Sequence, residues 1–304
     1  MQAGKISPKH AYLIIAHNKF KQLAVLLSLL DDPRNDIFLH IDRKSPYNNQ
    51  IRQELSKYIK YSRVTEINRS HIMWGGSNLV KCELDLLSEA AKGHYAYYHL
   101  LSGMDLPLKS QNEIHDFFDK HQGKEFVHFS DDKFTESEQR RMKYYWLFQN
   151  ITGRSAKGHK SVLGNMAKVL VRVQEKMHID RIRNGPFPVI KCGSQWFSIT
   201  DSLVQHILKQ QKNIKKAFRN TNCGDEELVQ TLIWNSPYRD NIFYDGMAAS
   251  NVRKIDWNRG EPYTWQSQDY WELINSGCLF ARKIDADQEP ELFSCLIRHV
   301  KEDK

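Results

Sequence analysis

The chain has 304 residues, enough for one large α/β domain or two small ones. Of these residues 40% are hydrophobic and 26% charged, as is typical of a soluble globular protein. It contains no low-complexity segment and no apolar run near the roughly 20 residues of a membrane span, which excludes a disordered chain and an integral membrane protein. The formal net charge of +8 indicates partners such as nucleic acid, an anionic membrane or phosphorylated small molecules.

The N-terminal part of the chain alternates between strand and helix patterns. Residues 11–16 form a short apolar run typical of a buried parallel strand, residues 20–30 have apolar positions at helical spacing, and residues 36–41 form a second apolar run. This β-α-β order predicts a parallel sheet, because parallel strands need a crossover connection. We expect the alternation to continue with a helix at 48–58, a strand at 64–67, a helix at 77–91, a strand at 97–101, a helix at 111–119 and a strand at 125–129.

Residues 130–188 are basic and have little strand character, so we expect an inserted segment there with a helix near 164–176. The C-terminal part returns to mixed patterns. We expect a strand at 196–199, helices at 202–210 and 226–235, a helix from residue 271, a strand at 278–281 and a C-terminal helix.

Polar residues follow three of the expected strands. They are His17-Asn18, Asp42-Arg43-Lys44 and Gly103-Met104-Asp105. Ligands of doubly wound α/β sheets bind at the carboxyl ends of the strands, so these residues mark an expected ligand edge.

The cysteines and the basic clusters admit simple interpretations. The five cysteines are scattered and never spaced as C-x-x-C, so we expect buried free thiols and no zinc site. The basic excess is concentrated at 140–143 and 154–183. These clusters fit either a solvated face or attraction to a nucleotide diphosphate or to a membrane that holds a lipid-linked acceptor.

Three short motifs each allow a functional and a structural interpretation. Trp74-Gly75-Gly76-Ser77 precedes a helix and fits either close approach of an anionic ligand or a turn in which Ser77 is the N-cap. Gly224-Asp225-Glu226-Glu227 opens a helix and supplies either a general base or caps. Arg282-Lys283 follows a strand and fits either a diphosphate site or a solvated strand end.

Seven segments together resemble the core-2/I-branching N-acetylglucosaminyltransferase family, which also contains the peptide O-xylosyltransferases. The segments run in the family's order and cover most of the chain. They are AYLIIAHN at 11–18, FLHIDRKS at 38–45, MWGGSNLVKCELDLL at 73–87, YYHLLSGMDLPLKS at 97–110, GSQWFSIT at 193–200, GDEELVQTL at 224–232 and LFARK at 279–283.

The resemblance implies a single GT-A-like α/β domain over 1–304, with a mostly parallel central sheet flanked by helices. It also implies a nucleotide-sugar-binding half at 1–130 and an acceptor-binding and catalytic half at 131–304. Carried onto matching positions, it implies that Glu226 is the catalytic base. The implied donor-binding residues are His17, Asp42, Arg43, Trp74, Gly75, Arg282 and Lys283, and the acceptor-binding residues are Gln195, Trp196, Trp257 and Tyr263.

Departures from the family pattern refine these expectations. Gly224 stands where the family usually has proline, and Gln195 stands where the xylosyltransferases have aspartate, which argues against peptide xylosylation. The family needs no metal, so we expect Arg282 and Lys283 to replace it and no cofactor to be used. Asp285-Ala286-Asp287 spells the D-x-D metal motif of other GT-A enzymes, but it lies beyond the last strand. Trp257 fits core packing as well as sugar stacking.

The implied reaction is inverting transfer from a UDP-sugar, with GlcNAc as the first donor and xylose, galactose or glucuronic acid as alternatives. The expected acceptor is a glycan or lipid-linked glycan in bacterial-type surface polysaccharide synthesis. The N-terminus lacks a signal peptide, so we expect a cytoplasmic enzyme with peripheral contact to the inner membrane face, unless an N-terminal anchor has been removed. A non-catalytic sugar-nucleotide- or glycan-binding protein stays an alternative. No nucleic-acid partner is expected, because no reader motif occurs.

Overall fold

A six-stranded sheet forms the centre of the molecule in the computed structural model, which describes residues 9–130, 136–153, 161–244, 246 and 249–302. Its strand order is β3-β2-β1-β4-β7-β6. The first four strands in this order are parallel, and β7 is antiparallel to both of its neighbours. The strands are β1 (His10–Ala16), β2 (Asn35–Ile41), β3 (Arg63–Glu66), β4 (Tyr97–Ser102), β6 (Phe126–Val127) and β7 (Phe197–Thr200).

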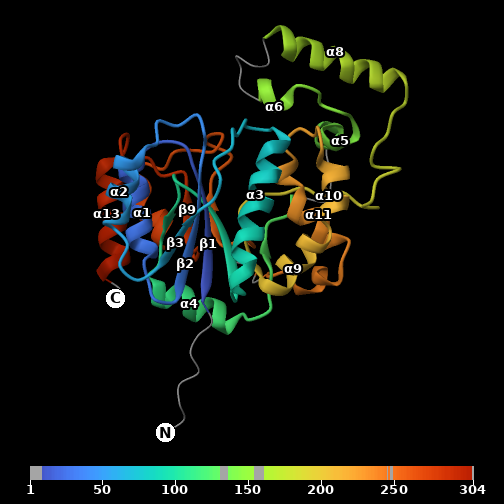
Figure 1. The fold of residues 1–304 in the computed structure, drawn as a ribbon. Helices are drawn as coiled ribbons and strands as arrows, with labels where there is room; N and C mark the ends of the chain where they lie inside the picture. The colour runs from blue at the N-terminus through green and yellow to red at the C-terminus, as the bar shows by residue number, and fades with distance from the viewer. Residues whose placement is uncertain (1–8, 131–135, 154–160, 245, 247–248, 303–304) are drawn as a thin grey trace.

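Helices cover both faces of this sheet (Figure 1). One face packs against α1 (Phe20–Leu30), α4 (Gln111–Lys120) and α13 (Pro290–Glu302), and α2 (Asn49–Ser56) lies beside α1. The other face packs against α3 (Ser77–Ala90), α9 (Asp201–Lys209), α10 (Gln211–Phe218) and α11 (Leu228–Trp234). The expected α/β class with a mostly parallel sheet flanked by helices is therefore confirmed.

The apolar run of β1 shows why this strand is buried on both sides. Successive side chains of a strand point to opposite faces of the sheet. Tyr12 and Ile14 accordingly join the core under α1, while Ala11 and Leu13 join the core under α3. All four side chains are fully buried. A continuous apolar run, rather than an alternating one, is what a doubly covered strand requires.

A second, three-stranded sheet brings the C-terminal part of the chain to the carboxyl end of β4. Its order is β5-β9-β8, with β5 (Leu106–Pro107), β8 (Arg253–Ile255) and β9 (Phe280–Arg282). The short helix α12 (Tyr270–Ile274) precedes β9. Because β9 pairs with β5, the residues that follow β9 lie beside the loop between β4 and β5. This pairing positions Arg282 and Lys283 at the ligand edge expected from the sequence.

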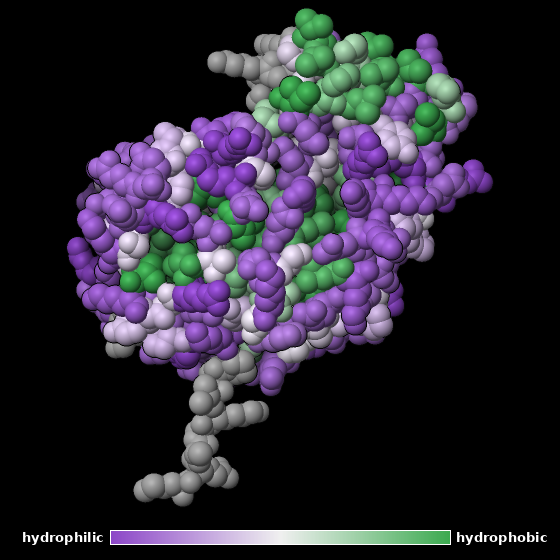
Figure 2. All heavy atoms as spheres, in the orientation of Figure 1, coloured by the Kyte–Doolittle hydropathy of each residue, from purple (hydrophilic) through white to green (hydrophobic). Residues whose placement is uncertain are grey.

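The described part of the basic segment between β6 and β7 combines helices with irregular loops. It contains α5 (Glu136–Lys143), α6 (Gln149–Thr152) and α8 (Val162–Lys176), which confirms the helix expected near 164–176. In Figure 1, α6 and α8 project from the body at the top of the view, and in Figure 2 apolar surface gathers over the same region. The cations at 154–160 belong to the expected basic cluster but lie outside the described residues.

Several expected boundaries are wrong in detail. The strand expected at 125–129 is only β6, and the helix expected from residue 226 begins at Leu228, after a 3-10 turn over Gly224–Glu226.

Cys295 is partly exposed, whereas the other four cysteines are buried, and all five are free thiols as expected. No helix among the described residues combines the length and the apolar character needed to cross a bilayer.

Candidate active site

A cavity of about 870 Å³ opens at the carboxyl ends of the parallel strands. It is bounded by the loops that follow β1, β2 and β4, by the end of β9 with Lys283 directly after it, and by other segments from the second half of the chain. Nine of the residues proposed from the sequence line this one cavity. They are His17, Asp42, Trp74, Gln195, Trp196, Glu226, Trp257, Arg282 and Lys283.

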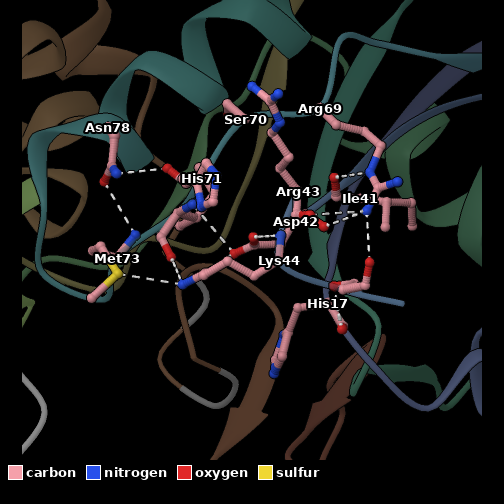
Figure 3. A network of polar contacts seen from close by, with 12 residues as sticks. His17, Ile41, Asp42, Arg43, Lys44, Arg69, Ser70, His71, Met73 and Asn78 are labelled. Carbon is pink, nitrogen blue, oxygen red and sulfur yellow. Dashed lines mark hydrogen bonds and ion pairs between the residues drawn. The ribbon is translucent and has the colours of Figure 1, made fainter. Parts of the chain in front are cut away.

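Three proposed residues do not line the cavity. The side chain of Arg43 is exposed and points away from His17 (Figure 3). Gly75 is buried, has a φ of 75°, and accepts a 2.9 Å hydrogen bond from the Cys223 amide through its carbonyl oxygen. Tyr263 lies under the guanidinium of Arg259, 4.3 Å from ring centroid to charge. Their ligand-binding roles stay predictions.

Asp42 organises the loop that follows β2 (Figure 3). Its carboxylate accepts hydrogen bonds from the amides of Lys44 at 2.8 Å and Ile72 at 3.2 Å. The guanidinium of Arg69 binds the carbonyl oxygens of Ile41 and Asp42 from behind. Asp42 therefore fixes the backbone of this cavity wall, and its predicted contact with the nucleotide would use the remaining lone pairs of an already ordered carboxylate.

Arg282 is held in place by three groups. Its Nη1 forms an ion pair with Asp105 Oδ1 at 2.8 Å and donates a hydrogen bond to Ser102 Oγ. The guanidinium also lies over the ring of Trp196, 4.4 Å from its centroid. The Asp105 side chain is 3% exposed and that of Arg282 is 18% exposed, so this is a nearly buried ion pair. A forked cation fixed in this way is preorganised for an anionic ligand.

His17 shares the same electrostatic environment. Partial burial lowers the pKa of His17 below its ordinary value, and the nearby cations Lys44, Arg282 and Lys283 act in the same direction against Asp42. The imidazole is therefore neutral near pH 7, where it can donate and accept a hydrogen bond.

Glu226 reaches the cavity from the 3-10 turn before α11. Its Oε2 forms an ion pair with Arg141 Nη1 at 2.6 Å, and its side chain remains 30% exposed. The backbone carbonyl of Glu226 accepts a 2.8 Å hydrogen bond from the amide of Gly193. A Cβ at Gly193 would lie 1.9 Å from the carbonyl oxygen of His128, so only glycine allows this close approach.

The acidic residues around Glu226 are buried. Burial raises the pKa of Glu83 well above its ordinary value, and the carboxylate of Asp225 acts in the same direction. Burial likewise raises the pKa of Glu227, against the opposing effect of Arg141. Glu83 Oε1 accepts a 2.9 Å hydrogen bond from the side-chain amide Nε2 of Gln195. Of these four acidic residues, Glu226 is the one that lines the cavity, which favours it as the group that meets a ligand.

The motifs at 74–77 and 224–227 do not cap their helices in the way that the N-cap interpretation of each motif predicts. Gly76, not Ser77, is the N-cap of α3, and Asn150 Oδ1 accepts a 3.1 Å hydrogen bond from the amide of Asn78. Glu227 occupies the N-cap position of α11, but its side chain makes no capping hydrogen bond. Simple capping therefore does not account for Glu227.

The aromatic residues divide into cavity walls and core. Trp74 is 52% exposed and Trp257 is 55% exposed, which rules out core packing for Trp257. Trp265 is fully buried and donates its indole N–H to the carbonyl of Arg282, so it supports the site rather than contacting a sugar. Exposed indole faces at a cavity wall are suitable for stacking on sugars or bases.

A family model described as "Branch: Core-2/I-Branching enzyme" matches residues 10–277. The chain belongs to the Core-2/I-Branching enzyme family. The GT-A-like fold class implied by this family agrees with the mostly parallel sheet and its flanking helices.

Curated relatives of this Core-2/I-Branching enzyme family member are named as xylosyltransferases. Xylosyltransferase 2 from Canis lupus familiaris is 22% identical over 317 residues, covering 95% of this chain and 33% of the relative. Xylosyltransferase 2 from Homo sapiens matches with the same identity and coverage. Xylosyltransferase oxt from Drosophila pseudoobscura pseudoobscura is 21% identical, covering 90% of this chain and 31% of the relative. The chain thus spans about a third of the length of these relatives.

Among solved structures, the apo form of mouse xyloside xylosyltransferase 1 aligns with 90% of this chain and 97% of that chain. The TM-score is 0.38 and the sequence identity 12%.

The D-x-D motif of this family member has its own partners. Asp285 and Asp287 both form ion pairs with Lys19, and Asp285 also accepts hydrogen bonds from the amides of Asp287 and Gln288. Neither aspartate lines the cavity. Across the part of the chain that is described, no group of three or more histidine, cysteine, aspartate or glutamate side chains is arranged to hold a metal ion.

Sequence reasoning missed the residues that position the proposed groups. Arg141 lies in the basic cluster noted at 140–143, but nothing in the sequence pairs it with Glu226, 85 residues away. The sequence marks Asp105 as a polar residue after a strand, but no local pattern pairs it with Arg282. Arg140, next to Arg141, also forms an ion pair, with Glu175. The basic cluster at 140–143 is therefore not simply a solvated face.

Proposed function

We propose that this chain is a UDP-sugar-dependent inverting glycosyltransferase that transfers GlcNAc to a hydroxyl of a glycan or lipid-linked glycan and forms a β-glycoside. The observation that carries the proposal is the common cavity, in which the carboxylate of Glu226 and the cations Arg282 and Lys283 all line the wall. Family membership and the names of the curated relatives support glycosyl transfer as the reaction class.

In the proposed reaction, Glu226 accepts the proton of the acceptor hydroxyl as that oxygen bonds to the anomeric carbon. The bond from the anomeric carbon to the β-phosphate oxygen breaks at the same time, so UDP leaves with the electron pair and the anomeric configuration inverts. Arg141 holds the Glu226 carboxylate in position through the 2.6 Å ion pair. The proton remains on Glu226 until solvent removes it.

Arg282 and Lys283 would stabilise the negative charge that develops on the departing UDP. Preorganised cations in a partly buried site stabilise such charge as a metal ion does in other enzymes. Arg282 is already fixed by Asp105 and Trp196, so little reorganisation is needed when the charge develops. We therefore propose transfer without a metal or other cofactor.

The substitution Glu226→Gln tests the base assignment. It keeps the size of the side chain but removes its ability to accept a proton, so kcat should fall by about 10²–10⁴-fold. UDP affinity, measured by calorimetry, should change by less than about threefold, because the diphosphate contacts lie on other residues. The control is Glu54→Gln, the same change on the exposed surface of α2. Normal turnover in Glu226→Gln contradicts the proposal.

The donor sugar has a second candidate. The curated relatives are named xylosyltransferases, which favours UDP-xylose as the alternative donor. Gln195 stands where those relatives are expected to carry aspartate, and its amide is bound to Glu83, which supports a non-peptide acceptor. UDP release measured with a panel of UDP-sugars, with and without glycan or peptide acceptors, separates these candidates. Binding of UDP-sugars without acceptor-dependent release would instead support a non-catalytic binding protein.

For the biological setting, we propose bacterial-type surface polysaccharide synthesis on the cytoplasmic side of the membrane. The net positive charge of the chain supports this proposal, because it attracts the protein to an anionic membrane surface.

A further inference from the structure

The helix α8 exposes apolar side chains on the face that points away from the protein. Their spacing of four, three and four residues places them on one side of a helix, and Met177 continues the row just beyond its end. We name this set the outer stripe of α8. Its members and exposed fractions are Val162 at 84%, Met166 at 41%, Val169 at 52%, Val173 at 45% and Met177 at 66%.

The opposite face of α8 is already occupied. Gly164, Ala167 and Val171 are buried against the protein. Gln174, on the same face, exchanges hydrogen bonds with the backbone of Tyr145 at 2.8 and 3.0 Å. A surface helix normally presents polar side chains on the face opposite its packed side. Because α8 is apolar on both, the outer stripe is available for a further contact.

Cations run along one edge of the outer stripe. Lys168, Arg172 and Lys176 follow one another at intervals of four residues, and Arg172 and Lys176 are exposed. On α6, which packs against α8, Ile151 is 63% exposed. Apolar surface gathers in the region of these two helices at the top of Figure 2. An apolar helix face bordered by lysine and arginine is the pattern of helices that lie in the interface of an anionic membrane.

We propose that the outer stripe of α8 docks into the headgroup region of an anionic bilayer, with the cationic edge contacting lipid phosphates. Charge decides between this partner and a second copy of the chain. Each chain carries a net charge of +8, so pairing two such faces brings like charges together. An anionic bilayer complements both the apolar stripe and its cations.

The helix α6, which packs against α8, connects the docking surface to the wall of the cavity. Asn150 of α6 binds the start of α3, next to Trp74 in the cavity wall. A chain docked through α8 therefore holds this side of the cavity close to the membrane surface. Under the proposed function, a lipid-linked acceptor would reach the site from there. The docking itself does not depend on that function.

Vesicle flotation of the full chain tests the proposal. The chain should float with vesicles of phosphatidylcholine and 30% phosphatidylglycerol, and much less with phosphatidylcholine alone. The variant Val169→Asn with Val173→Asn should lower the partition coefficient by about tenfold, because two apolar anchors become polar. Arg172→Gln with Lys176→Gln should weaken binding mainly at low salt. The matched control is Val64→Asn, which changes a 36% exposed valine on β3 and should bind as the wild type does.

Three results would overturn the proposal. These are no binding of the wild type to anionic vesicles, equal binding to neutral and anionic vesicles, and unchanged binding of the Val169→Asn, Val173→Asn variant. Analytical ultracentrifugation could instead show that the wild type forms a dimer, that it does not bind vesicles, and that the Val169→Asn, Val173→Asn variant is a monomer. This result would assign the outer stripe to contact with a second copy of the chain. Circular dichroism and UDP affinity of each variant establish that the fold and the cavity are intact. UDP affinity also separates failure of this proposal from failure of the proposed function.

Discussion

The ion pair between Asp105 and Arg282 gives a quantitative test of how the proposed diphosphate site is held. Asp105→Asn keeps the size of the side chain and removes its charge. The Nη1 to Oδ1 distance is 2.8 Å and the two side chains are 18% and 3% exposed, so Arg282 would be left as a nearly buried, uncompensated cation. Among the described residues, Arg282 Nε has no hydrogen-bond partner.

Breaking a buried ion pair from one side destabilises a protein by roughly 3–5 kcal/mol. Because Arg282 retains some exposure, we expect Asp105→Asn to lower the free energy of unfolding by about 3 kcal/mol. Arg282→Met should cost about 2 kcal/mol, since Asp105 keeps its hydrogen bonds from the Ser102 amide and hydroxyl. The double variant leaves no unpaired charge, so it should be more stable than the sum predicts by about 2 kcal/mol.

Urea unfolding of the wild type, both single variants and the double variant, without nucleotide, yields this coupling energy directly. The m-value should stay constant across the four proteins. Additive effects, within about 0.5 kcal/mol, would falsify the view that Asp105 and Arg282 form one preorganised unit.

Two further predictions concern pH and metal ions. Burial raises the pKa of Glu125 to about 7, against the hydrogen bonds it receives from Thr200. Because the pKa of Glu125 is raised in the folded state, its protonated form contributes stability that is fully present below about pH 4 and is lost as pH rises through about 7. The free energy of unfolding of the wild type should therefore fall by about 3 kcal/mol over that window, relative to that of Glu125→Gln. Urea unfolding from pH 4 to 8 measures this, and parallel profiles for the two proteins contradict it. Sugar transfer should persist in excess chelator, because Arg282 and Lys283 supply the positive charge. Strong inhibition that manganese reverses would contradict that mechanism.

Most of the central fold could be predicted from the sequence, because its elements have strong local patterns. The apolar run of β1 and the helical spacing in α1 and α3 each predict an element within a residue or two of its observed bounds. The strands β5 and β8 have two and three residues, too few to show any period, and they form only because β9 pairs with them.

The site was partly predictable for the same reason. Glu226 and Arg282 belong to continuous segments that resemble a family, and the fold brings them to one cavity. Arg141 and Asp105 act through pairings between residues distant in sequence, which no local pattern encodes. The helical period of α8 predicts the helix but not which of its two apolar sides is packed.

The arrangement of the proposed site is tested most directly by a crystal structure of the protein with bound UDP. The account predicts the diphosphate in contact with Arg282 and Lys283, with the terminal phosphate directed into the part of the cavity that Glu226 lines. Electron density for UDP outside this cavity, or a diphosphate out of reach of both cations, would contradict the account.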